Sequence, residues 1–299
     1  MLVFSVVLCL AVIVPGLLAP GADASLRLVW SELFGLAALS AVVASGSNLT
    51  PGPFLRLTRP RPAALVLGAL LGVAGMAVAE GLAIPWVAIL PRGMLERFDV
   101  GRLFDQPPWE RLAIAVAAST VAPLCEELAF RGYLLSALGL RRRPAVAIAL
   151  SALVFALIHL DPVRFPAVLF LGLLYGWIAW RTGSVWPSAL AHVVNNGIVS
   201  AVALAGGGGR LADAAPTREA IGAAIELGAG AVVLLTGLAL GLAHLTAPPP
   251  PVACAVLRDP TDPGDGFRFA RVPPGLALAV PAGLLSLALL VLAGWWRAG

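Results

Sequence analysis

The sequence predicts an all-α membrane protein, a polytopic bundle of about eight to nine transmembrane helices. Composition is the first observation behind this fold class: 60% of the 299 residues are hydrophobic and only 12% are charged, a balance typical of integral membrane proteins. The second is that apolar stretches long enough to cross a bilayer recur along the chain. The third is that Pro-rich or Arg-rich loops separate these stretches. No segment has the composition of a separate soluble domain.

The apolar stretches define nine expected spans. Their approximate limits are 2–19, 30–44, 63–90, 109–140, 144–160, 163–180, 184–204, 219–245 and 276–296. Ala22-Asp23-Ala24 resembles a signal-peptidase site after the first span, but the positive n-region of a signal peptide is missing, which favours a retained helix. Gly172 and Gly176, four residues apart, favour close helix packing. We expect three regions: N-terminal helices in 1–109, catalytic helices in 110–205 and C-terminal helices in 206–299.

Arginine clusters predict the orientation. All 20 basic residues are Arg, and two dense groups occur, one at Arg56, Arg59 and Arg61 and one at Arg141 to Arg143. The number of spans between them places both on one side, which the positive-inside rule assigns to the cytoplasm. The absence of Lys and the abundance of Ala, Gly and Pro indicate a bacterial protein, and hence the bacterial inner membrane. Basic runs interleaved with aromatics are lacking, so nucleic-acid binding has no support.

Two adjacent glutamates and an arginine, Glu126, Glu127 and Arg131, lie inside the fourth span. An ionisable side chain near the bilayer centre costs about 2.5–3.5 kcal/mol on insertion scales, so such groups usually pair and mark function. Glu127 and Arg131 are four residues apart and can pair along the helix. Glu126 points elsewhere and is left for chemistry. Pro123, one turn earlier, frees a backbone carbonyl and can kink the helix. A structural charge cluster that ties helices together is the alternative.

Two of the three histidines lie in later spans, each with a notable residue at helical spacing. Phe155 and His159 are four residues apart, and so are His192 and Asn196, so each pair shares a helix face. The three cysteines, Cys9, Cys125 and Cys254, are too far apart to form a metal cluster and do not indicate a disulfide framework.

These three motifs, in this order on successive membrane helices, resemble those of the CAAX protease and bacteriocin-processing family. This is the CPBP or Abi family of intramembrane proteases, related to the Ras-converting CAAX prenyl endopeptidase. The resemblance covers about residues 110–205, roughly a third of the chain. It implies an all-helical protease that hydrolyses peptide bonds near or within the membrane, with membrane-associated proteins or peptides as its partners.

The resemblance also implies a role for each motif residue. Glu126 is the expected catalytic carboxylate and His159 its partner in activating water, while His192 and Asn196 stabilise the oxyanion. The resemblance assigns a structural role, the support of the site, to Glu127, Arg131 and Phe155. Hydrolysis of an amide needs a base and hydrogen-bond donors aimed at the developing oxyanion, which these side-chain types supply.

Metal dependence is open at this point. Glu126, His159 and His192 make up a two-His, one-carboxylate set that suits zinc with an open position for water. Asn196 is a poor zinc ligand but a good oxyanion donor, which favours a mechanism without a cofactor. The spacing of these residues does not distinguish the zinc mechanism from the one without a cofactor, because the two histidines lie on different helices.

Two other functions compete with proteolysis. Buried acids and histidines could form the relay of a proton- or ion-coupled transporter, although no internal repeat supports one. A non-proteolytic immunity or scaffold protein could also keep the motifs. Glu32 and Glu80, before the motif helices, are interpreted as groups that bond between helices or lie near an interface.

Overall fold

The computed structural model describes residues 23–38, 40–41, 44, 50–206 and 216–246. All regular secondary structure in these residues is helical, which confirms the all-α class. The predicted spans at 2–19 and 276–296 lie outside the described residues, as does part of the span at 30–44. The expected total of eight to nine spans therefore stays a prediction.

Five helical stretches are long and apolar enough to cross a membrane. They are α5 (Pro62–Val87), a continuous rod at Pro108–Gly139, α11 (Phe165–Thr182), α12 (Trp186–Leu204) and α13 (Arg218–Leu245). A shorter apolar helix, α10 (Pro144–Ile158), lies between the rod and α11. These helices coincide with the spans predicted for this part of the chain, and the protein is an integral membrane protein.

The rod that carries the paired glutamates changes its helical type along its length. It consists in order of α7 (Pro108–Val116), η3 (Ala117–Val121), α8 (Ala122–Glu127), η4 (Leu128–Leu134) and α9 (Leu135–Gly139), of which η3 and η4 are π-helical. Pro123 has no N–H to donate to the preceding turn. In that turn the Thr120 hydroxyl donates to the Val116 carbonyl oxygen. The motif helix is thus flanked by two π-helical segments, a feature frequent at functional sites.

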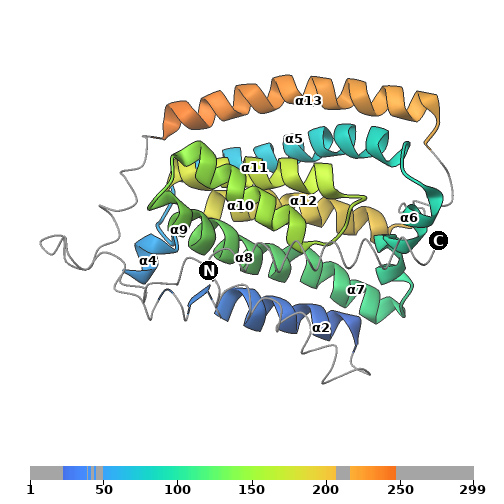
Figure 1. Ribbon diagram of the computed structural model, residues 1–299, viewed down its shortest axis with the longest axis horizontal. Helices are drawn as coiled ribbons and strands as arrows, with labels where there is room; N and C mark the ends of the chain where they lie inside the picture. Colours follow the sequence, from blue (N-terminus) through green and yellow to red (C-terminus); the bar gives the residue numbers. More distant parts are fainter. Residues whose placement is uncertain (1–22, 39, 42–43, 45–49, 207–215, 247–299) are drawn as a thin grey trace, which may run out of the picture.

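The helices form successive layers (Figure 1). α13 packs on α5, and α5 packs on α11 and α12. α10 lies against α11 and the rod, and α12 also contacts the rod. On the outer side of the rod lie α2 (Ala24–Trp30) and the π-helical η1 (Ser31–Ala38). Short elements complete the described chain: α4 (Pro51–Phe54), α6 (Arg92–Arg97) and η2 (Val100–Phe104).

Glycines allow close contact at two of these helix crossings. A Cβ atom added at Gly68 of α5 would lie 2.5 Å from the carbonyl oxygen of Pro187 on α12, and one at Gly72 would meet the backbone of Ala191. On α11, a Cβ at Gly172 would lie 3.2 Å from Ala152 of α10. Small residues let helix backbones approach closely, so the packing predicted for Gly172 is confirmed.

Arg56 fastens the loop between α4 and α5 to one end of the bundle. Its buried side chain donates from Nε to Ser136 Oγ at 3.0 Å and lies over the Trp180 ring, and its carbonyl oxygen accepts from Val185 N. Burial lowers the pKa of the Arg56 guanidinium to about 10. Ser136 lies five residues before the Arg141 to Arg143 cluster. The two arginine clusters therefore lie at the same end of the bundle, as their spacing predicted.

Candidate active site

Glu127 and Arg131 form an ion pair at the centre of the site. Arg131 Nη1 lies 3.0 Å from Glu127 Oε1, and both side chains are 1% exposed. Arg131 also donates from Nη2 to the carbonyl oxygen of Gly172 at 3.2 Å. The pairing predicted from the four-residue spacing is therefore present. A buried pair of this kind is costly to break, and the bond from Arg131 to Gly172 connects η4 to α11.

His192 connects α12 to both glutamates. Its Nδ1 lies 3.2 Å from Glu127 Oε1, and its Nε2 lies 3.6 Å from Glu126 Oε2. The Glu126 side chain is 12% exposed, against 1% for Glu127. The two adjacent acids thus have different surroundings: Glu127 is enclosed by Arg131 and His192, whereas Glu126 faces His192 and is partly exposed.

Aromatic rings surround these charged groups. The guanidinium carbon of Arg131 lies 4.3 Å from the ring centre of Phe155 and 5.5 Å from that of Tyr175. Tyr175 stacks on the His192 ring with centroids 4.8 Å apart. Phe155 meets the rings of His159 and His192 edge to face. Cation–π and stacking contacts of this type fix the orientation of Arg131 and His192.

His159 follows the last residue of α10 and is partly buried. Its Nδ1 lies 2.8 Å from the Phe155 carbonyl oxygen. A carbonyl oxygen can only accept, so Nδ1 carries the proton and Nε2 of the neutral ring holds a lone pair. The Phe155 ring contacts the rings of both His159 and His192, and His192 in turn faces Glu126. The structure thus brings Glu126, His159 and His192 together from three helices.

Asn196 lies one turn after His192 on α12. It donates from Nδ2 to the Ala118 carbonyl oxygen at 3.0 Å, and its Oδ1 lies 3.5 Å from Nδ2 of the buried Asn195. Ala118 belongs to η3, about two turns before Glu126 on the rod. The described hydrogen bonds of Asn196 therefore connect it to the rod, and not to the two histidines.

The zinc hypothesis was tested on the donor atoms. Among the residues that the structure describes, no three His, Cys, Asp or Glu side chains are arranged to hold a metal ion. His192 Nδ1 faces Glu127, and His159 Nδ1 is bonded to Phe155, so only the Nε2 atoms are left as ligands. The set of Glu126, His159 and His192 does not fit a zinc site in this arrangement.

Sequence reasoning missed two residues beside the site. Tyr175 lies on α11 between Gly172 and Gly176, and its position against His192 emerges only when α11 packs on α12. A polar ring inside an apolar span, one of only two tyrosines in the chain, was an available signal. The second is Glu32, which is buried on η1, a segment that packs against α8. Glu32 was interpreted as a group that bonds between helices or lies near an interface, because nothing in the sequence indicated that η1 lies beside α8.

Comparison with known families bears on this arrangement. Residues 108–198 match the family model described as type II CAAX prenyl endopeptidase Rce1-like. This segment is a CAAX protease domain of that family. It begins with α7 and ends within α12, and the resemblance seen in the three motifs is confirmed. No match was found among curated proteins or among solved structures.

The match has a functional consequence for residues 108–198. The family that this segment matches consists of intramembrane proteases of the glutamate type, which act on proteins. The CAAX protease domain contains the whole rod, α10 and α11. All the residues described above at the site, except Glu32, therefore lie within it.

Proposed function

We propose that this chain is an endopeptidase of a bacterial cytoplasmic membrane that hydrolyses a peptide bond in a membrane-associated protein or peptide. Glu126 and His159 activate a water molecule, and His192 and Asn196 stabilise the oxyanion. One observation carries the proposal. Of the two adjacent glutamates, Glu127 is bound to Arg131, while Glu126 is without an arginine partner among the described residues, faces His192 and is partly exposed.

Water activation requires an acceptor for the proton of the attacking water. Glu126 is assigned this role because its carboxylate, unlike that of Glu127, is partly exposed and is not bound by an arginine among the described residues. His159 presents its Nε2 lone pair toward the same region because its Nδ1 is held by the Phe155 carbonyl oxygen. The proton taken by Glu126 then passes to the nitrogen of the leaving amine, so base and acid are the same group at successive steps.

The oxyanion requires donors that point at the former carbonyl oxygen. His192 donates from Nδ1 to Glu127, so its Nε2 serves as a donor when it too carries a proton. The Asn196 amide has two N–H groups, of which the Ala118 carbonyl oxygen accepts one. The other N–H has no acceptor among the described residues and is assigned to the oxyanion.

Glu127, Arg131 and Phe155 act by holding these groups. Arg131 is enclosed between the Phe155 and Tyr175 rings and neutralises Glu127. Glu127 in turn fixes Nδ1 of His192. Removal of Arg131 would leave a buried carboxylate without its cation.

A pair of variants separates catalysis from support. We expect Glu126→Gln to abolish cleavage while thermal unfolding in lipid nanodiscs stays near wild type, because Gln keeps the size of the side chain but is no base. Arg131→Ala is expected to lower the free energy of unfolding by about 3–5 kcal/mol, the usual cost of leaving one half of a buried ion pair, and to reduce cleavage as well. Equal loss of folding in both variants would contradict the assignment.

The substrate is found by comparing membranes of cells that carry wild type and Glu126→Gln. Newly formed protein termini are labelled and identified by mass spectrometry. Termini present only with Glu126 intact establish proteolysis and identify its substrate. If no termini differ but wild type alone rescues a phenotype, the proposed chemistry is wrong and the transporter hypothesis takes its place. If Glu126→Gln also rescues the phenotype, the scaffold hypothesis takes the place of the proposed chemistry.

A further inference from the structure

The carbonyl group of Ala118 lies in η3, just before the rod returns to α-helix, and Pro123 deprives it of a backbone donor. In a π-helical turn the N–H of each residue bonds to the carbonyl oxygen five residues earlier. The Ala122 N–H follows this pattern and donates to the Ala117 carbonyl oxygen. The next donor in the series would be residue 123, but proline has no N–H. The donor that would continue the series at Ala118 is therefore missing.

Asn196 of α12 supplies a donor in its place. Its Nδ2 donates to the Ala118 carbonyl oxygen at 3.0 Å, and α12 packs against η3. An unpaired backbone carbonyl in an apolar segment is costly, and side chains of neighbouring helices usually satisfy the groups that a proline frees. Because a carbonyl oxygen can only accept, this bond assigns an N–H of the Asn196 carboxamide to Ala118.

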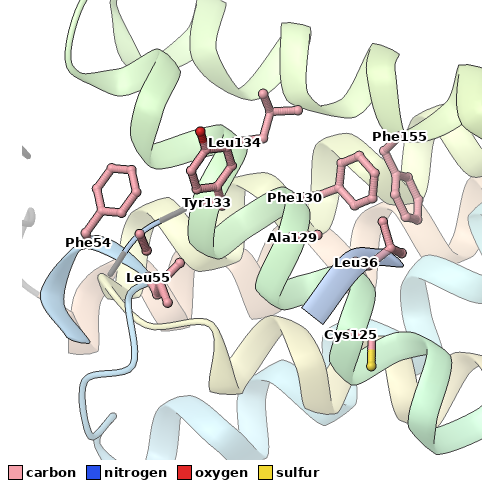
Figure 2. Close-up of a cluster of buried hydrophobic side chains, with 10 residues drawn as sticks. Leu36, Phe54, Leu55, Cys125, Ala129, Phe130, Tyr133, Leu134 and Phe155 are labelled. Carbon is pink, nitrogen blue, oxygen red and sulfur yellow. The ribbon is translucent and has the colours of Figure 1, made fainter. Parts of the chain in front are cut away.

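Packing around Pro123 holds this part of the rod in place. Cys125, two residues after the proline, belongs to the buried cluster that Figure 2 shows, together with Phe130 and Phe155. Val121, two residues before the proline, packs against the same cluster. Pro123 is itself buried. The backbone on both sides of Pro123 is thus held by the core, and this gives Asn196 a fixed acceptor on the rod.

We propose that Pro123 is a positioning residue of the protease site. By withholding an N–H from the Ala118 carbonyl oxygen, Pro123 reserves that oxygen for Asn196 and so restricts the orientation of the Asn196 carboxamide. The two N–H bonds of a carboxamide lie in one plane, so the bond made by one of them limits where the other can point. The second N–H is the one assigned to the oxyanion, and the inference rests on that proposed role of Asn196.

The first test is the pair of variants Pro123→Ala and Pro144→Ala. Pro123→Ala introduces an N–H that competes with Asn196 for the Ala118 carbonyl oxygen. We expect kcat to fall about 10-fold, less than the roughly 10²–10³ for loss of a whole oxyanion donor, with little change in KM. The unfolding temperature in nanodiscs is not lowered, because the rod gains a backbone hydrogen bond. A merely structural proline would not lower kcat while stability is kept.

Pro144 is the matched control. It is an exposed residue at the start of α10, where a missing N–H has no partner within the helix. We expect Pro144→Ala to change neither kcat nor KM. A wild-type kcat in Pro123→Ala overturns the inference.

A double-mutant cycle tests whether Pro123 acts through Asn196. In Asn196→Ala there is no carboxamide to orient, so the added N–H has no further effect on catalysis. We expect the double variant Pro123→Ala/Asn196→Ala to have the same kcat as Asn196→Ala alone. Losses that multiply in the double variant would show that the two residues act independently, which also overturns the inference.

A third test does not depend on turnover. With Pro123 present, Asn196→Ala leaves the Ala118 carbonyl oxygen without its donor, and we expect the unfolding temperature to fall by roughly 2–4 °C. In the Pro123→Ala background the new N–H bonds this oxygen, so Asn196→Ala lowers the unfolding temperature much less. Equal falls in the two backgrounds overturn the inference. If the falls differ but Asn196→Ala keeps the wild-type kcat, the proposed oxyanion role of Asn196 fails, while the connection of Pro123 to Asn196 stands.

Discussion

At the scale of the residue, neighbours assign different tasks to identical side chains. Glu126 and Glu127 are adjacent in sequence, yet Glu127 is enclosed by Arg131 and His192, while Glu126 is partly exposed. A carboxylate locked in a buried ion pair is poorly placed to exchange a proton, since its charge is needed to balance the cation. A carboxylate open to water is able to accept one. The different roles of Glu126 and Glu127 therefore follow from their contacts and not from their residue type.

Asn196 provides a residue-scale test of oxyanion stabilisation. We expect Asn196→Ala to lower kcat by about 10²–10³, the usual effect of losing one such donor, with little change in KM. Asn195→Ala is the matched comparison, because Asn195 precedes Asn196 and bonds to it but is not a proposed donor to substrate. Steady-state kinetics on the substrate found by terminal labelling measures both. Equal losses in the two variants would mean that the effect comes from packing on α12.

Metal dependence is a second question that can be tested at the residue scale. We expect protein purified without a histidine tag to contain far less than one zinc ion per chain and to keep its activity after dialysis against a chelator. The reason is the geometry of the donors, since the described side chains include no set of three that could hold a metal ion. Elemental analysis is the measurement. About one zinc per chain, lost in His159→Ala, would contradict the expectation.

At the scale of the element, α12 is positioned by glycines on α5. His192 is the residue after Ala191, whose backbone a Cβ atom at Gly72 would meet. The distance between α5 and α12 at this contact therefore sets the position of His192, which faces both glutamates. The rod makes the matching contribution, because its π-helical η4 carries Arg131 to Glu127 and to the Gly172 carbonyl oxygen of α11.

Gly72→Ala tests this element-scale contact. The added methyl group forces α5 and α12 apart, and overpacking of this kind typically costs about 1–3 kcal/mol. We expect a lower unfolding temperature and a fall in kcat, because His192 is displaced. The control is Gly237→Ala on α13, where an added Cβ has no atom within 4 Å. Thermal unfolding and kinetics in nanodiscs measure both variants, and wild-type behaviour of Gly72→Ala would exclude the contact as a constraint.

At the scale of the whole molecule, the charges of the loops are distributed unevenly. Arg56, Arg59, Arg61 and the Arg141 to Arg143 cluster share one end of the bundle, where Arg61 also donates to the Leu245 carbonyl oxygen at the end of α13. At the opposite end, beyond the last residue of α5, arginines alternate with acids, as in the Arg92–Glu96 pair. The positive-inside rule then places the arginine-rich end in the cytoplasm.

Cysteine labelling checks this orientation. In a background with Cys9 and Cys254 replaced by Ser, we expect Arg97→Cys to react with a membrane-impermeant maleimide in intact cells, and Arg142→Cys to react only after the membrane is opened. Arg97 ends α6 at the mixed-charge end, whereas Arg142 belongs to the basic cluster. The reverse pattern would show that the bundle is inserted the other way.

Local patterns in the sequence predicted the all-α class, the described spans and the Glu127–Arg131 pair. Each depends on neighbours in one helix or on the transfer of an apolar segment into lipid, both of which are set by composition and spacing. The family resemblance was also available at this level, because three motifs in register are a property of the chain itself.

Only the tertiary structure decided how the motif helices meet. His192 contacts Glu127 across 65 positions of sequence, Tyr175 stacks on His192, and η1 packs against α8. These contacts depend on how closely helices pack and how they are rotated about their axes, and both properties come from many side chains and from glycines such as Gly72 acting together. The sequence by itself therefore determined which residues could do chemistry, and the packing determined which of them face one another.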